Sequence, residues 1–198
     1  MNETKAKTVL FFGPSGAGKG TQVELLKEHL KKQSERKMVY IEMGGLLRGM
    51  VARGDLTGKL TNEIISNGRL MPSFMPIYLM TQYLVDHFTG QEHIVADGVT
   101  RREGQARAFD DAMVFYGRED YEVVSIELSS EKIIERLLAR GRNDDSEEKI
   151  QRRIDWYNKD VLPALGVMEG RGRTIHRIDG APEVEEVHQE ILKALELT

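Results

Sequence analysis

A glycine-rich segment near the start of the chain limits the possible folds more than any other feature. Residues 13–22 read GPSGAGKGTQ, follow directly on the apolar run Val9–Phe12, and precede the amphipathic stretch Val23–Leu26. Glycines lack Cβ atoms, so successive backbone N–H groups can turn inward around phosphate oxygens, and the following helix adds its positive N-terminal end. The ammonium group of Lys19 would lie against the outer phosphates. The segment therefore predicts a strand, a phosphate-binding loop and a helix, with a nucleoside triphosphate as the first ligand to consider.

One position of this loop differs from the general phosphate-binding pattern. Gly20 stands where that pattern has serine or threonine, and Thr21 is the nearest hydroxyl. Thr21 is therefore a candidate contact for phosphate or for a metal ion bound with it.

The composition limits the class of protein. The chain has 198 residues, of which 40% are hydrophobic and 30% charged, with a net charge of -4, as expected for one globular domain with one core. The acidic balance argues against a nucleic-acid partner. There is no cysteine, and the histidines show no close metal-like spacing, so we expect neither disulfides nor zinc. The charged N-terminus leads into an apolar run too short for a signal peptide or a membrane span, so we expect a cytoplasmic protein without membrane contact.

Short runs rich in β-branched residues alternate with longer helical patterns along the chain. The strand-like runs are Val9–Phe12, Met38–Ile41, Ile94–Ala96, Val123–Leu128 and Thr174–Ile178. Helical periodicity is clearest in Gln22–Lys32, Ser129–Arg140, Glu147–Leu165 and Glu183–Leu195. Buried strands joined by helical crossovers predict an α/β fold with a five-stranded parallel sheet flanked by helices.

Two stretches depart from this alternation. Residues 43–71 hold two short helical patterns broken by glycines, which indicates a small helical insertion. Residues 141–146 are short, polar and charged, and indicate a loop between two helices. The aromatic pair Trp156–Tyr157 is expected to pack in the core rather than to stack on a base.

Arginine is the most informative residue type outside the glycine-rich loop. Its planar guanidinium group suits phosphate oxygens bidentately. Phosphoryl transfer between two nucleotides must hold several negative charges close together, and arginines stabilise them without proton chemistry. The arginines at the ends of elements or in the polar loop are Arg48, Arg101, Arg102, Arg136, Arg140, Arg142, Arg152 and Arg153.

Asp97 ends the third predicted strand, immediately before Gly98. The carboxyl ends of parallel strands are where α/β proteins place their ligands. Asp97 is therefore a candidate to hold Mg²⁺ through water beside the loop.

Together these residues resemble the adenylate kinases and, more widely, the nucleoside monophosphate kinases. The resemblance runs from about Thr8 to Pro182. The matching motifs are the loop 13–22, Gly44–Arg48, Gly54, Gly58–Lys59, Gly68–Pro72, Asp97–Arg101 with Gln105, Arg136–Arg140, Arg142–Asp145, Arg153 and Arg177–Gly180.

The resemblance implies a P-loop kinase core with two additions. The core would comprise residues 1–41, 72–138 and 147–198, with an acceptor-binding insertion at 42–71 and a lid at 139–146. Only Gly141 separates Arg140 from Arg142, so the lid is short and lacks the zinc-bearing extension of many bacterial members. We expect a monomer.

The resemblance also assigns roles to residues. The activity implied is reversible transfer of the γ-phosphoryl group of Mg-ATP to AMP, giving two ADP, with Mg²⁺ held by Asp97 through water and Thr21 as a further candidate contact. ATP would be bound by Gly16, Ala17, Gly18, Lys19, Gly20, Thr21, Arg136, Arg140 and Arg177. AMP would be bound by Met43, Gly44, Arg48, Arg69, Leu70, Met71, Gly98, Arg101, Gln105, Arg142 and Arg153. The residues expected to act on the transferring group are Lys19, Arg101, Arg136, Arg140, Arg142 and Arg153.

Two alternatives stay open from the sequence. Met43 stands where a base-proximal threonine is usual in adenylate kinases, which suggests a kinase for UMP, CMP or another nucleoside monophosphate, although Gln105 favours adenine. Gly45 replaces an acidic residue and Val99–Thr100 replaces Phe-Pro, which suggests a catalytically silent nucleotide-binding module. Lys19 and the full set of arginines argue against the second alternative, because simple binding needs fewer charges.

Overall fold

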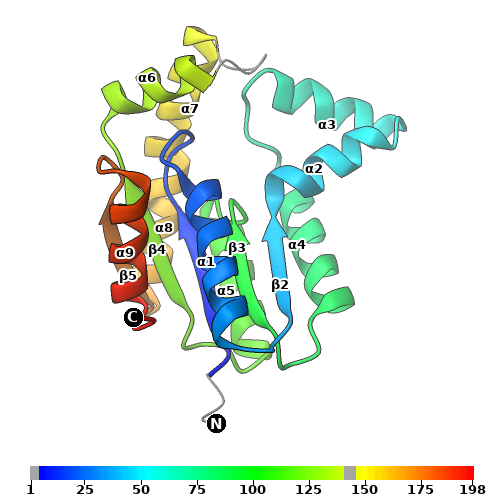
Figure 1. The fold of residues 1–198 in the computed structure, drawn as a ribbon. Coiled ribbons are helices and arrows are strands. Elements are labelled where there is room, and N and C mark those ends of the chain that lie inside the picture. The colour runs from blue at the N-terminus through cyan, green and yellow to red at the C-terminus, as the bar shows by residue number, and fades with distance from the viewer. Residues whose placement is uncertain (1–4, 141–145) are drawn as a thin grey trace.

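The sheet has five parallel strands in the spatial order β2-β3-β1-β4-β5 (Figure 1). The structure is a computed structural model that describes residues 5–140, apart from the side chain of Arg140, and residues 146–198. The strands are β1 (Thr8–Phe12), β2 (Met38–Glu42), β3 (His93–Asp97), β4 (Glu122–Glu127) and β5 (Thr174–Asp179). Because the two strands on either side of β1 are far apart in sequence, their connections leave the sheet by helical crossovers.

Helices cover both faces of the sheet, which is why β1 is apolar throughout. Val9 and Phe11 pack on one face against the helices α1 (Lys19–Gln33) and α9 (Val184–Ala194). Leu10 and Phe12 pack on the other face, in the cluster formed with the remaining core helices. Those helices are α4 (Phe74–His87), α5 (Glu103–Phe115) and α8 (Leu162–Gly170). A strand buried on both faces reads as a continuous apolar run rather than an alternating one.

Two helical pairs rise from the carboxyl edge of the sheet, where the glycine-rich loop also lies. The pair α2 (Met43–Ala52) and α3 (Leu56–Ser66) follows β2, and the pair α6 (Ser130–Arg140) and α7 (Glu147–Trp156) follows β4. Figure 1 shows the two pairs on opposite sides of this edge, far from the chain termini. Both pairs therefore lie at the end of the sheet that binds ligands in parallel α/β folds.

The structure confirms the five predicted strands and the parallel sheet, and it corrects the prediction for the helices. The helices α4 and α5 were missed. The single helix expected over 147–165 is divided by a π-helical turn at Tyr157–Val161, after which α8 begins. In the part of the chain that the structure describes, no helix is both long and apolar enough to cross a membrane.

A buried carboxylate on α5 forms hydrogen bonds with residues at the end of α8 and just before β5. The side chain of Asp110 is fully buried and accepts hydrogen bonds from Tyr121 Oη at 2.8 Å, Arg171 Nη1 at 2.6 Å and Arg173 Nε at 2.5 Å. Burial alone would raise the pKa of Asp110, but the hydrogen bonds from Arg173, Arg171 and Tyr121 outweigh it and lower that pKa. The ionised carboxylate is therefore the form that stabilises the fold.

Replacing Asp110 by asparagine should lower the free energy of unfolding at pH 7 by about 2–4 kcal/mol, because two guanidinium groups lose their buried partner. A lowered folded-state pKa means that this stabilisation is present above the unfolded pKa of about 3.9 and is lost as the pH falls below it. Urea unfolding of parent and variant at pH 7 and pH 3.5 measures both effects, and the difference between the proteins should shrink at the lower pH.

Asp111 provides the matched control, because it bonds the same Arg171 at 2.7 Å but has an exposed side chain. Asp111→Asn should change stability by at most about 0.5 kcal/mol. Equal losses in the two variants would show that burial of Asp110 is not what makes the cluster stabilising.

Candidate functional site

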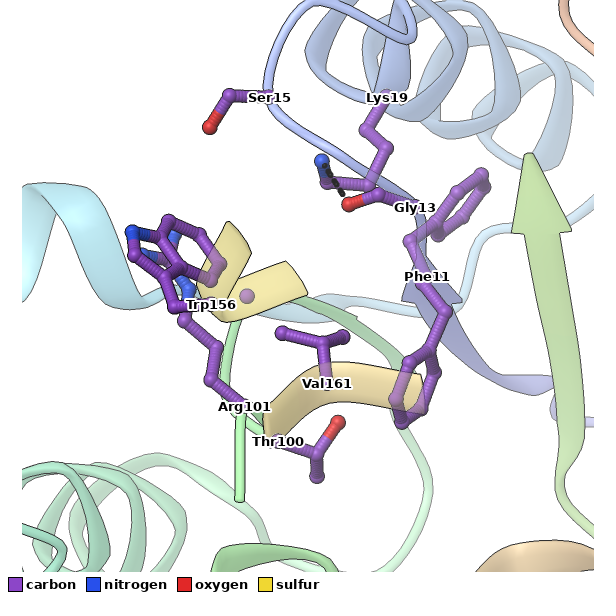
Figure 2. Close-up of a pocket in the computed structure, with 10 residues that line it drawn as sticks. Phe11, Gly13, Ser15, Lys19, Thr100, Arg101, Trp156 and Val161 are labelled. Carbon is purple, nitrogen blue, oxygen red and sulfur yellow. Dashed lines mark hydrogen bonds between the residues drawn. The ribbon is translucent and has the colours of Figure 1, made fainter. Parts of the chain in front are cut away.

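The loop between β1 and α1 is shaped by its glycines and carries its lysine on the first helical turn. Gly13 has φ 140°, and a Cβ there would lie 2.6 Å from the carbonyl oxygen of Ile126, so the loop packs directly on the end of β4. Lys19 begins α1, and its Nζ donates to the carbonyl oxygens of Gly13 at 2.8 Å and Pro14 at 2.9 Å. The ammonium group thus lies inside the curve of the loop, as Figure 2 shows.

A first cavity opens beside this loop and is lined from three parts of the chain. Ser15 and Lys19 line it from the loop, Thr100 and Arg101 from the segment after β3, and Trp156 from the end of α7. In Figure 2 the loop residues lie on one side of the cavity, and Arg101 and Trp156 lie on the other. The remaining lining residues are Phe11, Phe12, Gly13, Gly98 and Val161. The cavity therefore joins the phosphate loop to a predicted acceptor residue, Arg101.

A second cavity lies between the α2–α3 pair and the segment after β3. Its lining is mostly apolar, which suits the flat face of a base, and it includes three polar side chains. The lining residues are Met43, Leu47, Ile65, Arg69, Leu70, Met71, Pro76, Gly98, Arg101 and Gln105. Seven of them are predicted AMP-binding residues, namely Met43, Arg69, Leu70, Met71, Gly98, Arg101 and Gln105. Gly98 and Arg101 line both cavities, so the two spaces meet at Arg101.

Arg101 is held at this junction by the backbone that precedes it. Gly98 has φ 68°, and a Cβ there would lie 3.2 Å from Arg101 Nη2, so the guanidinium group folds back over the glycine. Burial lowers the pKa of Arg101, the Asp97 carboxylate partly offsets that effect, and the neighbouring Arg153 guanidinium lowers the pKa further. Arg153 itself is only 8% exposed. The guanidinium group of Arg153 thus disfavours the charged form of Arg101, and an anion bound at Arg101 would favour that form.

Gln105 has a role that the sequence did not indicate. Its side chain is buried at the first turn of α5, and Oε1 accepts the backbone N–H of Arg101 at 2.8 Å. The carbonyl oxygen thus fixes the backbone of the arginine at the junction. Because an amide oxygen accepts two hydrogen bonds and Nε2 offers two more, Gln105 can still bond a base in the second cavity.

The segment after β5 lies beside the phosphate loop. The N–H of Gly180 donates to the carbonyl oxygen of Glu127 at 2.8 Å, and a Cβ at Gly180 would lie 3.3 Å from the carbonyl oxygen of Ala17. Arg136 Nη2 reaches the carbonyl oxygen of Ala181 at 3.4 Å. Arg177 bonds Glu127 at 2.7 Å and Glu169 at 2.5 Å, so its side chain is engaged in surface ion pairs.

The carboxyl end of β3 carries a buried polar atom that is suited to a hydrated cation. Asp97 Oδ1 is buried and has no hydrogen-bond partner among the described residues. Within residues 5–140 and 146–198, no group of three or more His, Asp or Glu side chains is arranged to hold a metal ion. Any metal here would therefore take most of its ligands from water and from a phosphate.

Comparison with known proteins identifies the family to which this arrangement belongs. The sequence profile described as "Adenylate kinase" matches residues 11–173. The chain belongs to the adenylate kinase family. It is 34% identical to an adenylate kinase of Thermus thermophilus over 193 residues, covering 96% of this chain and 97% of that protein. It is 32% identical to the adenylate kinase of Deinococcus deserti, and the match covers 99% of this chain and 100% of that protein.

A third relative gives the same result. The adenylate kinase of Stenotrophomonas maltophilia is 31% identical to this chain over 191 residues, with 94% of this chain and 98% of that protein covered. The similarity thus extends over the sheet and its helices, the α2–α3 pair and the helices α6 and α7.

The structure explains one departure of this chain from the family pattern. The resemblance leads us to expect an acidic residue at position 45, where this chain has glycine, and the structure places the carboxylate of Glu42 beside that glycine. Its Oε1 bonds Arg48 Nη2 at 2.8 Å, and a Cβ at Gly45 would lie 2.9 Å from its Oε2. The sequence signal was a glutamate at the very end of the second strand, directly before the motif. Arg48, a predicted acceptor-binding residue, therefore has an acidic neighbour.

Other predicted residues fall at identifiable places. Gly16, Ala17 and Gly18 form the loop, and Gly20 and Thr21 belong to the exposed first turn of α1. Gly44 is in the first turn of α2, next to the Arg48 guanidinium group. Arg140 ends α6, and Arg142 lies outside the described residues. Trp156 packs against the core as expected, and in addition it lines the first cavity.

Lys19→Met should retain the fold, because the ammonium group lies in the part-buried loop and outside the hydrophobic core, but it should reduce turnover about a hundredfold or more. Steady-state assays with ATP and AMP, together with circular dichroism, measure both effects. Lys31→Met changes an exposed lysine in the last turn of the same helix and serves as the control. Near-parental turnover in Lys19→Met would remove this residue from the mechanism.

Proposed function

We propose that this chain transfers the γ-phosphoryl group of Mg-ATP to AMP, reversibly giving two ADP. The observation that carries the proposal is the position of Arg101. It lies where the cavity beside the phosphate loop meets the mostly apolar second cavity, and the buried Arg153 acts on its charge. An enzyme that transfers a phosphoryl group between two nucleotides needs its positive charge at such a junction.

The residues divide into two binding sets and one transferring set. Backbone amides of residues 16–21 and the ammonium group of Lys19 would hold the ATP phosphates, with Arg136 and the backbone after β5 beside them. Arg48 and Arg101 would bind the AMP phosphate. Arg153, with Arg140 and Arg142 of the lid segment, would stabilise the charge on the transferring group. The attacking oxygen already belongs to an anionic phosphate, so no strong general base is required.

Mg²⁺ fits the polar groups on the donor side of the site. Asp97 would hold it through water, because its Oδ1 is buried and free of partners among the described residues, and the exposed hydroxyl of Thr21 lies on the first turn of α1. When bound, the ion would neutralise the phosphate charge. The monomeric state and the cytoplasmic location expected from the sequence stay predictions.

The acceptor base follows from the second cavity and from the relatives. All three relatives named above are adenylate kinases, which favours AMP over UMP or CMP. Met43 is only 2% exposed and lines the apolar part of this cavity, where it would contact the base without hydrogen bonding. A silent binding module is disfavoured, because it has no need for Arg101 at the junction of two cavities with the buried Arg153 acting on its charge. Formation of ADP from ATP and AMP in a coupled assay tests the proposed reaction directly.

Gln105→Glu should lower kcat/KM for AMP about tenfold to a hundredfold and should raise kcat/KM for GMP relative to that for AMP. The carboxylate can still accept the Arg101 N–H, so the junction is kept, but it no longer offers a donor to N1 of adenine. The N1–H of guanine, by contrast, would find an acceptor. The values of kcat/KM for AMP, GMP, CMP, UMP and dTMP at saturating Mg-ATP measure the change.

Gln105→Ala and Gln189→Glu separate the possible causes. Gln105→Ala removes the bond to Arg101 as well and should reduce turnover for all acceptors. Gln189→Glu adds the same charge at an exposed site on α9 and should leave the acceptor ranking unchanged. If the parent used CMP or UMP as well as AMP, the adenylate assignment would fail while the kinase reaction could stand.

A further inference from the structure

The single tryptophan of the chain connects the α2–α3 pair to the catalytic junction. Trp156 ends α7, and its Nε1–H donates to the carbonyl oxygen of Gly68 at 3.1 Å. Gly68 follows α3 and has φ 66°, a conformation suited to glycine. The residues directly after it, Arg69, Leu70 and Met71, line the second cavity.

The contact between α7 and the segment after α3 involves one whole face of the helix. Arg152 Nη1 reaches the carbonyl oxygen of Asn67 at 3.4 Å, and a Cβ at Gly68 would lie 3.7 Å from Cβ of Lys149. Lys149, Arg152 and Trp156 are spaced at i, i+3 and i+7, so they share a face. The indole N–H makes the shorter of the two hydrogen bonds to this segment.

The other side of the same indole supports Arg101. The guanidinium carbon of Arg101 lies 5.3 Å from the centre of the Trp156 ring, within the range of a cation–π interaction. Figure 2 shows the arginine side chain extending toward the ring at the edge of the first cavity. An aromatic face attracts the cation without occupying its N–H groups, so all five donors of Arg101 stay available for phosphate.

The π-helical turn that follows explains how the tryptophan can reach this place. In a π-turn the hydrogen bond runs from residue i to residue i+5, so residues five apart lie one turn above each other. Trp156 directly precedes the turn Tyr157–Val161, Val161 ends it, the two are five residues apart, and both line the first cavity. Asp160 in this turn also pairs with Arg102 at 3.4 Å, which ties the turn to the residue after Arg101.

We propose that Trp156 is a positioning residue that couples binding of the acceptor in the second cavity to the orientation of the Arg101 guanidinium group. The proposal rests on the phosphotransferase function stated above. An acceptor bound in the second cavity orders the segment 68–71, that segment fixes the indole through the carbonyl of Gly68, and the indole holds the Arg101 guanidinium in the junction. Trp156 touches neither reacting group in this account.

Two substitutions separate the two contacts of the indole. Trp156→Phe removes the N–H donor but keeps an aromatic face, and it should weaken AMP affinity about 3- to 10-fold while ATP affinity changes less than about twofold. Trp156→Leu removes the aromatic face as well and should lower kcat by a further factor of about 3 to 10. Calorimetry with AMP alone and with ATP alone, followed by steady-state kinetics, gives these values.

Tyr116→Phe is the control, because it removes a polar tip from an aromatic side chain at the far end of α5 and should change neither affinity. In the parent, the emission of the single tryptophan should change on saturation with AMP, which tests the contact without any substitution. An unchanged emission, unchanged AMP affinity in Trp156→Phe, or equal losses of AMP and ATP affinity would each overturn the coupling.

Failure of the proposed phosphotransferase function would give a different experimental result from failure of the coupling through Trp156. A parent that binds AMP but forms no ADP contradicts the phosphotransferase reaction, whereas the affinity difference in Trp156→Phe still tests the contact to Gly68. A parent that binds no AMP would overturn both proposals.

Discussion

The position of Arg101 is the constraint on which the site depends. Arg101 lies, partly buried, at the meeting point of two cavities, and Arg153 is only 8% exposed. Burial and the neighbouring Arg153 both lower the pKa of Arg101, and the Asp97 carboxylate only partly offsets them. Two positive charges near each other do not stabilise a fold by themselves. The arrangement is favourable once several phosphate charges lie in the junction, which is the state that phosphoryl transfer requires.

The surrounding structure places these charges through short-range contacts. The positive φ of Gly98 lets the Arg101 side chain fold back, the Gln105 amide oxygen accepts its N–H, and the Trp156 ring lies beside its guanidinium group. All three contacts come from different elements, so Arg101 is oriented by the sheet edge, by α5 and by α7 together. Such support from independent elements is what holds a functional group within the narrow tolerance that transfer needs.

The sequence predicted the sheet and the phosphate loop because both depend on local patterns. Strands buried on both faces appear as short apolar runs, and the loop 13–18 is marked by glycines that the backbone requires. The helix α4 was missed because Phe74–His87 is apolar on most sides, which hides the helical period. The π-turn at Tyr157–Val161 was missed because one shifted turn leaves the periodicity of its flanking helices intact.

The contacts that link distant segments could not be predicted in the same way. The bond from Trp156 to Gly68 joins residues 88 positions apart, and no local pattern marks it. The carboxylate over Gly45 comes from Glu42, which lies outside the motif that the family pattern describes. The bond from Gln105 to the Arg101 backbone spans only four residues, yet it depends on how α5 begins. These contacts belong to tertiary structure, which no local pattern of the sequence marks.

The most direct test of this account is the affinity for a single ligand that fills both cavities. Two adenosines joined through five phosphates would bring the phosphate loop and the paired arginines into contact with one chain of charges. Calorimetry should show this ligand binding about a hundredfold or more tightly than ATP alone, because the second nucleotide is already tethered at its site. An affinity no better than that of ATP would show that the two cavities do not form one site around Arg101.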